Sequence, residues 1–153
     1  MYTKEESKKI KMEFWSTFKE YSKKNKKKKW IMQDTGINKV NLKFEFDTEK
    51  ARVGYDIYAY DVETRIYYYE KFESLKSILE EALQQPLIWD LEYPITPKKD
   101  MAKIYLEITN VNILDKKTWN TVIDFFFKKM TILENIFLEY YDFIKYKPDY
   151  GTN

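Results

Sequence analysis

The chain has 153 residues, and its 44% hydrophobic and 18% aromatic content is enough for a folded core even though 34% of the residues are charged. It contains no histidine and no cysteine, which excludes disulfide bonds, thiolate nucleophiles, zinc–thiolate sites and histidine general bases. The 27 basic and 25 acidic residues leave a net charge of +2, so the chain as a whole has no strong electrostatic attraction for nucleic acid.

The length is typical of one domain, and we expect residues 1–153 to form a single domain with a mobile tail from about residue 147. The sequence contains neither an apolar signal segment nor a membrane-spanning run of about 18 apolar residues. We therefore expect a cytoplasmic protein without a membrane partner.

The first predicted element is an amphipathic helix over residues 4 to about 24. Thr3 and Glu6 have the spacing of a capping box, in which each side chain bonds the backbone of the other at the start of a helix. The lysine run 23–29, broken only by Asn25, should end this helix in a solvated loop, and anion binding is the alternative. The apolar residues at helical spacing are Ile10, Phe14, Phe18 and Tyr21.

Residues 40–46 and 51–57 alternate between apolar and polar side chains, which predicts two half-buried strands. Residues 47–50 have turn character, so the two strands should form a hairpin whose register is set by matching the apolar faces. The pairs that this register brings together are Phe46 with Ala51, Phe44 with Val53, Leu42 with Tyr55, Val40 with Ile57 and, on the polar side, Glu45 with Arg52.

A third strand is predicted over about 65–70, which extends the hairpin to a meander. Helical spacing returns over 72–83, and Pro86 ends this central helix. Two further strands, over 87–93 and 101–108, should pair as a hairpin. The predicted fold is therefore α+β, with an antiparallel sheet of about five strands, an N-terminal helix, a central helix and a long C-terminal helix.

The long C-terminal helix follows Asp115, which can cap it, and its apolar residues step by four and three in a heptad seam. One interpretation of this seam is core packing. The other is a homodimer interface, because the seam is longer than many monomeric helices show. The seam residues are Trp119, Ile123, Phe126, Met130, Leu133, Phe137, Tyr140 and Ile144.

The polar face of the predicted meander is the leading candidate for a binding site. A mixture of arginine and tyrosine suits the cations of a protein partner or stacking on nucleic-acid bases. The alternative is that a helix covers this face and the tyrosines pack beneath it. The residues assigned to the face are Arg52, Asp56, Tyr58, Arg65, Tyr67 and Tyr69.

A metal-dependent hydrolase is the weakest alternative. It would need carboxylates and a lysine to converge, and the available residues are Asp56, Glu63, Glu70 and Lys71. Glu70 and Lys71 are adjacent, so on a strand their side chains would leave opposite faces. We therefore predict no catalytic residue, no metal ligand and no cofactor, and lean against an enzyme.

The chain resembles a bacterial family known as domain of unknown function 4268. The segments that carry the resemblance are residues 13–18, 30–31, 35–37, 72–73 with Leu75, Trp89, 112–113, Asp115 and Trp119. These are mainly packing and capping residues, so the resemblance supports a fold and implies no catalytic residue. Members of the family occur alone or at the ends of larger, often restriction-related proteins, which implies an accessory role.

The interpretation that we favour is a non-enzymatic interaction module whose partner is another protein or a second copy of the chain. It would act through the polar sheet face or the helix seam. The alternative is an accessory nucleic-acid-binding domain of a restriction or defence system. That alternative rests on the lysine run 23–29, on the tyrosine-rich strands and on the restriction-related proteins in which the resemblance implies that family members occur.

Overall fold

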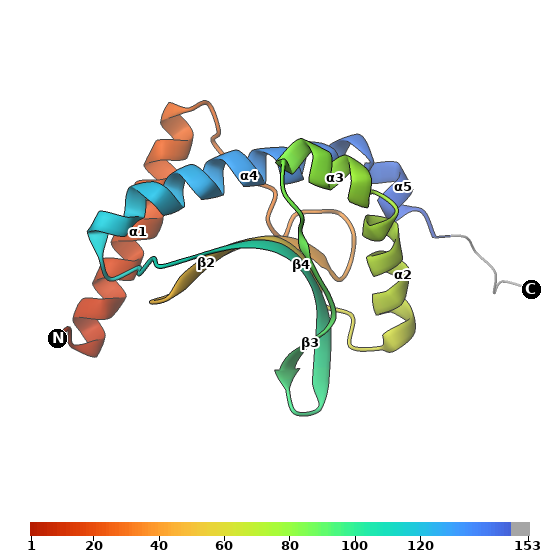
Figure 1. Ribbon diagram of the computed structural model, residues 1–153, viewed down its shortest axis with the longest axis horizontal. Helices are drawn as coiled ribbons and strands as arrows, with labels where there is room; N and C mark the ends of the chain where they lie inside the picture. Colours follow the sequence, from red (N-terminus) through yellow and green to blue (C-terminus); the bar gives the residue numbers. More distant parts are fainter. Residues whose placement is uncertain (148–153) are drawn as a thin grey trace, which may run out of the picture.

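The computed structural model describes residues 1–147 and arranges them as helices around one antiparallel sheet (Figure 1). The part of the predicted mobile tail that follows residue 147 lies outside the described residues. No helix in the described part of the chain combines the length and the apolarity needed to cross a membrane. The elements in chain order are α1 (Lys4–Lys24), β1 (Val40–Phe46), β2 (Lys50–Ile57), α2 (Val62–Glu73), α3 (Lys76–Leu83), β3 (Ile88–Thr96), β4 (Lys99–Thr109), the 3-10 helix η1 (Lys116–Thr118), α4 (Trp119–Glu139) and α5 (Tyr141–Lys145).

The predicted N-terminal helix is confirmed as α1. Its capping box is complete, because the Glu6 N–H donates to the Thr3 hydroxyl at 3.1 Å and the Thr3 N–H donates to the Glu6 carboxylate at 3.1 Å. The helix ends at Lys24, inside the lysine run, as the change of pattern predicted.

The sheet has the strand order β1-β2-β4-β3, and every neighbouring pair is antiparallel. The hairpin of β1 and β2 has the predicted register throughout, from Val40 opposite Ile57 to Phe46 opposite Ala51. The hairpin of β3 and β4 is also confirmed, with Trp89 opposite Ile104. Strand β4 lies between β2 and β3 and is therefore a central strand.

The predicted strand over 65–70 is wrong, because this segment belongs to α2, and the sheet consequently has four strands instead of about five. The helix begins after Asp61, whose carboxylate accepts a hydrogen bond from the Thr64 N–H at 3.0 Å. Isoleucine and tyrosine favour strands intrinsically, but burial of a helical stripe overrides that preference here. The predicted central helix is divided, since Phe72 belongs to α2 and α3 begins only at Lys76. The residues that α2 buries are Arg65, Tyr68 and Phe72.

Substitution of Asp61 tests this helix start directly. We expect Asp61→Ala to lower the urea concentration at the midpoint of unfolding, because the Thr64 N–H loses its cap. Asp61→Ser should retain most of the stability, since serine is also a good N-cap. Urea unfolding of the two variants measures the difference. Equal midpoints for alanine and serine would contradict the capping role.

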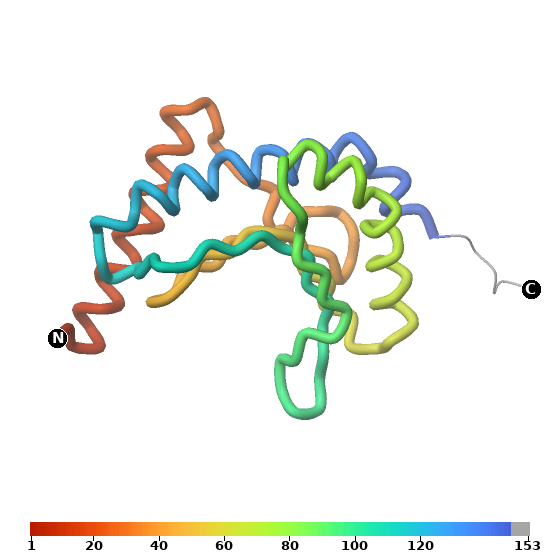
Figure 2. The backbone as a smooth tube through the Cα atoms, viewed as in Figure 1, coloured from red at the N-terminus to blue at the C-terminus, as the bar shows by residue number. Residues whose placement is uncertain are grey.

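The sheet is arched, and the helices lie on its convex side or beside its bent end (Figures 1 and 2). Helix α4 runs along the convex side, where the Tyr55 hydroxyl of β2 donates to the Leu133 carbonyl at 2.6 Å. The rings of Phe14 and Phe18 on α1 lie 6.1 and 5.6 Å from the ring of Phe126 on α4. The apolar core therefore lies entirely between the convex face and the helices. Among the described residues, no helix covers the concave face.

Candidate functional site

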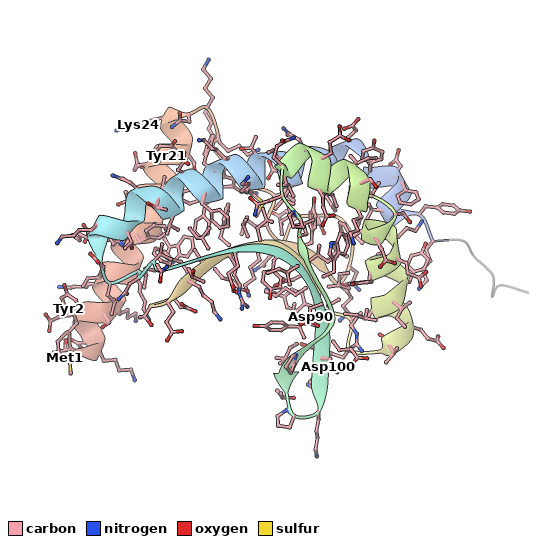
Figure 3. All side chains as sticks on the ribbon, in the orientation of Figure 1. Met1, Tyr2, Tyr21, Lys24, Asp90 and Asp100 are labelled. Carbon is pink, nitrogen blue, oxygen red and sulfur yellow. The ribbon has the colours of Figure 1, made fainter. Side chains whose placement is uncertain are left out.

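The concave face carries charged and tyrosine side chains contributed by all four strands. Alternation along each strand directs its apolar residues into the core and its polar residues onto this face. Figure 3 shows side chains projecting beneath the arch, with Asp90 and Asp100 marking the bent end formed by β3 and β4. We call this set the charged sheet face. Its members are Lys43, Glu45, Arg52, Asp56, Tyr58, Tyr93, Lys103, Tyr105 and Glu107.

Lys103 and Asp56 form the centre of the charged sheet face. Their side chains are only 4% and 2% exposed, and the Lys103 Nζ lies 2.8 Å from an Asp56 carboxylate oxygen. The same ammonium lies 2.6 Å from a Glu45 carboxylate oxygen. Burial opposes the charge of Lys103, but the two carboxylates outweigh it and raise the lysine pKa, so the lysine is charged at neutral pH. Burial raises the pKa of Asp56 against the opposite pull of Lys103.

Arg52 is the second centre of the network. Its Nε donates to Glu107 at 2.6 Å, and its Nη1 donates to the Tyr93 hydroxyl at 2.8 Å. The Arg52 guanidinium lies over the Tyr105 ring at 4.7 Å. These contacts hold an arginine that is 11% exposed in one orientation. Gly54, the residue paired with Tyr105, allows close approach of the β4 backbone, because a Cβ there would clash with the Ile104 carbonyl oxygen.

The rim of the face is more accessible and is tied to the centre. The Tyr58 hydroxyl lies 3.4 Å from an Asp56 carboxylate oxygen and 3.4 Å from the Lys43 Nζ. Lys43, Arg52 and Lys103 supply three positive charges, and Glu45, Asp56 and Glu107 supply three negative charges. The network therefore has fixed charges of both signs, and its net formal charge is zero.

The six residues predicted to share one face are divided between two places. Arg52 and Asp56 lie on the charged sheet face, as the alternation of β2 predicted, and Tyr58, which directly follows β2, lies beside Asp56. Arg65, Tyr67 and Tyr69 lie on α2 instead, because their segment is helical. The predicted face is therefore wrong in half of its members.

The three residues on α2 have packing roles. The Arg65 guanidinium is buried and donates to the Asp100 carbonyl at 3.0 Å, which fastens α2 to β4. The Tyr67 hydroxyl donates to the Tyr146 carbonyl, and the Tyr69 ring lies 5.8 Å from the Trp89 ring, edge to face.

The face also contains residues that sequence reasoning missed. Tyr93, Lys103, Tyr105 and Glu107 lie in segments that were predicted as strands, and the last three alternate on one side of β4. That alternation was the available signal. It could not be used, because nothing local shows that β4 pairs with β2.

The heptad seam is buried within this chain. All of its positions except Tyr140, which is partly exposed, are buried between the sheet and the other helices. The helix breaks at Tyr140, so Ile144 belongs to α5. The burial agrees with core packing. The buried seam residues are Trp119, Ile123, Phe126, Met130, Leu133, Phe137 and Ile144.

The residues considered for a hydrolase do not converge. Asp56 lies on the sheet and is paired with Lys103, whereas Glu63, Glu70 and Lys71 lie on α2. Lys71 donates to the Phe143 carbonyl at 2.9 Å and so holds α5. Within residues 1–147, no three carboxylates come together as a metal site.

The fold and the charged sheet face define an α+β domain with a network of polar, buried or partly buried side chains on the concave side of its sheet. A family model described as "Domain of unknown function (DUF4268)" matches residues 10–141. The chain belongs to this family, as the resemblance predicted. Comparisons with curated proteins and with solved structures found no match.

Proposed function

We propose that this chain is a non-enzymatic interaction module that binds a protein partner across the charged sheet face. The observation that carries the proposal is that the four strands present a polar face that no described helix covers, whose charges are held in fixed positions and whose rim is partly exposed. A surface that is already ordered loses little side-chain entropy when a partner docks. Such preorganised side chains favour specific recognition of a partner.

The balance of charges supports a protein as the partner. A nucleic-acid backbone is attracted by surplus positive charge, which the network of the charged sheet face does not have. A protein surface can match both signs, and tyrosine is enriched in protein interfaces. Glu45 and Glu107 are 33% and 23% exposed and can accept bonds from such a partner. Lys103 would fix the position of Glu45, and Arg52 would fix that of Glu107.

Site-specific photo-crosslinking tests the proposal. We expect a photoreactive amino acid at Tyr93 of the full chain, expressed in cells, to crosslink one defined protein. The same amino acid at Leu138, which is 54% exposed on α4, should not crosslink that protein. Light scattering of the purified chain shows whether the partner is a second copy.

Charge reversal then connects the crosslinked protein to the face. With that protein purified, Lys43→Glu should weaken binding about tenfold, because it reverses one charge at the rim. Lys9→Glu on α1 makes the same change in net charge and should leave binding unchanged. Equal affinities of the two variants, or crosslinking from Leu138 as strong as from Tyr93, would refute the proposal.

Of the features behind the nucleic-acid alternative, the lysine run lies apart from the charged sheet face. Figure 3 labels Lys24 at the top of α1, away from the concave side. Three lysines of the run are in ion pairs: Lys27 with Glu134, Lys29 with Asp34 at 3.1 Å and Lys23 with Glu20 at 3.9 Å. A binder of this kind should lose affinity steeply as salt rises, and no binding at low salt would eliminate it.

A further inference from the structure

A cavity of about 320 Å³ lies between the second half of α1 and the loop that follows it. This volume is at the lower end of the range for small-molecule sites, about 300–1,000 Å³. Its lining combines aromatic rings with lysines, and the residues that matter here are Trp15, Phe18, Trp30, Phe44, Lys19 and Lys28.

The aromatic part of the cavity consists of rings held in place by one another. Phe18 and Trp30 are parallel, with ring centres 6.2 Å apart, and Phe44 stands nearly perpendicular to both at 5.0 and 5.6 Å. Trp15 stacks on Phe126 at 5.9 Å and is 37% exposed, so its indole is fixed from the core side and accessible from the other. Such walls suit a planar ligand.

The Trp30 indole N–H and the Ser22 hydroxyl, two polar groups of the cavity, are bonded to each other. The Trp30 Nε1 donates to the Ser22 hydroxyl at 3.2 Å, and Ser22 is 2% exposed. These two groups therefore do not select a ligand by hydrogen bonding. Aromatic stacking without hydrogen-bond recognition accepts any nucleic-acid base, because every base has a π-face.

The mouth of the cavity has surplus positive charge. Of its lysines, Lys27 is committed to Glu134 and Lys29 to Asp34. Lys19 and Lys28 have no ion-pair or hydrogen-bond partner among the described residues, and no acidic residue lines the cavity there. The ligand that complements this mouth has a planar apolar body and an anionic group.

We propose that this cavity binds a nucleotide, with its base against the aromatic walls and its phosphate at Lys19 and Lys28. The nucleotide could be a free mononucleotide or one unpaired nucleotide of a single strand, since both present the same base and phosphate. The inference does not depend on the charged sheet face, so the two proposals can fail separately.

Nuclear magnetic resonance of the full chain tests the site, because the four tryptophan indole N–H signals report on it individually. Deoxyadenosine monophosphate should shift the signals of Trp15 and Trp30 and leave that of Trp119, which lies in the core, unchanged. Deoxyadenosine, which has no phosphate, should bind about tenfold more weakly. A short single-stranded oligonucleotide is the second arm. Tighter binding of the oligonucleotide identifies a strand as the source, and equal binding identifies the mononucleotide.

Matched charge reversals distinguish binding in the cavity from nonspecific electrostatic attraction of the phosphate to the lysine-rich surface. Lys19→Glu with Lys28→Glu should weaken binding of the monophosphate about tenfold. Lys24→Glu with Lys26→Glu changes the net charge equally, but neither residue lines the cavity, so binding should change less than twofold.

A packing variant completes the test. Trp15→Ala should abolish the shift of Trp30 while the far-ultraviolet circular dichroism remains unchanged, because Trp15 is partly exposed. The proposal is overturned if neither nucleotide shifts the two indoles at low salt. It is equally overturned if both charge-reversed pairs weaken binding alike.

Discussion

Replacement of Lys103 by methionine is expected to lower the free energy of unfolding by about 3–5 kcal/mol. The Lys103 ammonium lies 2.8 Å from Asp56 and 2.6 Å from Glu45, and methionine keeps the length of the side chain while removing its charge. Asp56, which is 2% exposed, would then be a buried carboxylate without a cation. Urea unfolding at neutral pH measures the loss.

The pH dependence of this deficit distinguishes lost charge from lost packing. Burial already raises the pKa of Asp56 in the wild type, and removal of Lys103 raises it further. A folded-state pKa above the unfolded value of about 3.9 means that folding favours the protonated carboxyl. That contribution is complete below the unfolded pKa and is lost as the pH rises through the folded pKa. The deficit of Lys103→Met should therefore shrink as the pH falls toward 4.

Two further variants control the experiment. Adding Asp56→Asn to Lys103→Met should recover more than half of the lost stability, because the unpaired charge is gone. Lys43→Met, at the rim of the same face, should change stability by less than about 0.5 kcal/mol. A double variant as unstable as Lys103→Met would show that packing, and not charge, explains the loss.

The local parts of the fold were predictable because their signals are short-ranged. The capping box of Thr3 and Glu6 set the start of α1, and alternation with a four-residue turn set the register of β1 and β2. The order of the strands was not predictable, since the place of β4 beside β2 depends on residues about 50 positions apart.

The residues of the candidate site that lie on β2 were predictable from local alternation, whereas those on β4 were not. Arg52 and Asp56 followed from the alternation of β2, but their partners Lys103 and Glu107 required the strand order. The prediction for the α2 segment was wrong because tyrosines favour a strand. The buried stripe of the helix begins with Arg65, a charged residue that does not look like part of an apolar stripe. A buried arginine bonded to backbone carbonyls is a tertiary arrangement that no local pattern indicates.

Phe126→Ala is expected to lower the free energy of unfolding by about 3–5 kcal/mol. Phe126 is 0% exposed, and its ring lies 4.9 Å from Phe44 and 5.6 Å from Phe18, so alanine would leave a cavity where α1, α4 and the sheet meet. Leu138→Ala on the same helix should change stability by less than about 0.5 kcal/mol, because Leu138 is 54% exposed.

The dependence on protein concentration decides between the two interpretations of the helix seam. If the seam is part of the core, unfolding of both the wild type and Phe126→Ala has a midpoint that does not change with concentration. If the seam joined two copies, the midpoint of the wild type would rise with concentration and Phe126→Ala would abolish that rise. Burial of Phe126 against Phe14 and Phe18 of its own chain leads us to expect the first result. Chemical unfolding over a hundredfold range of concentration measures it.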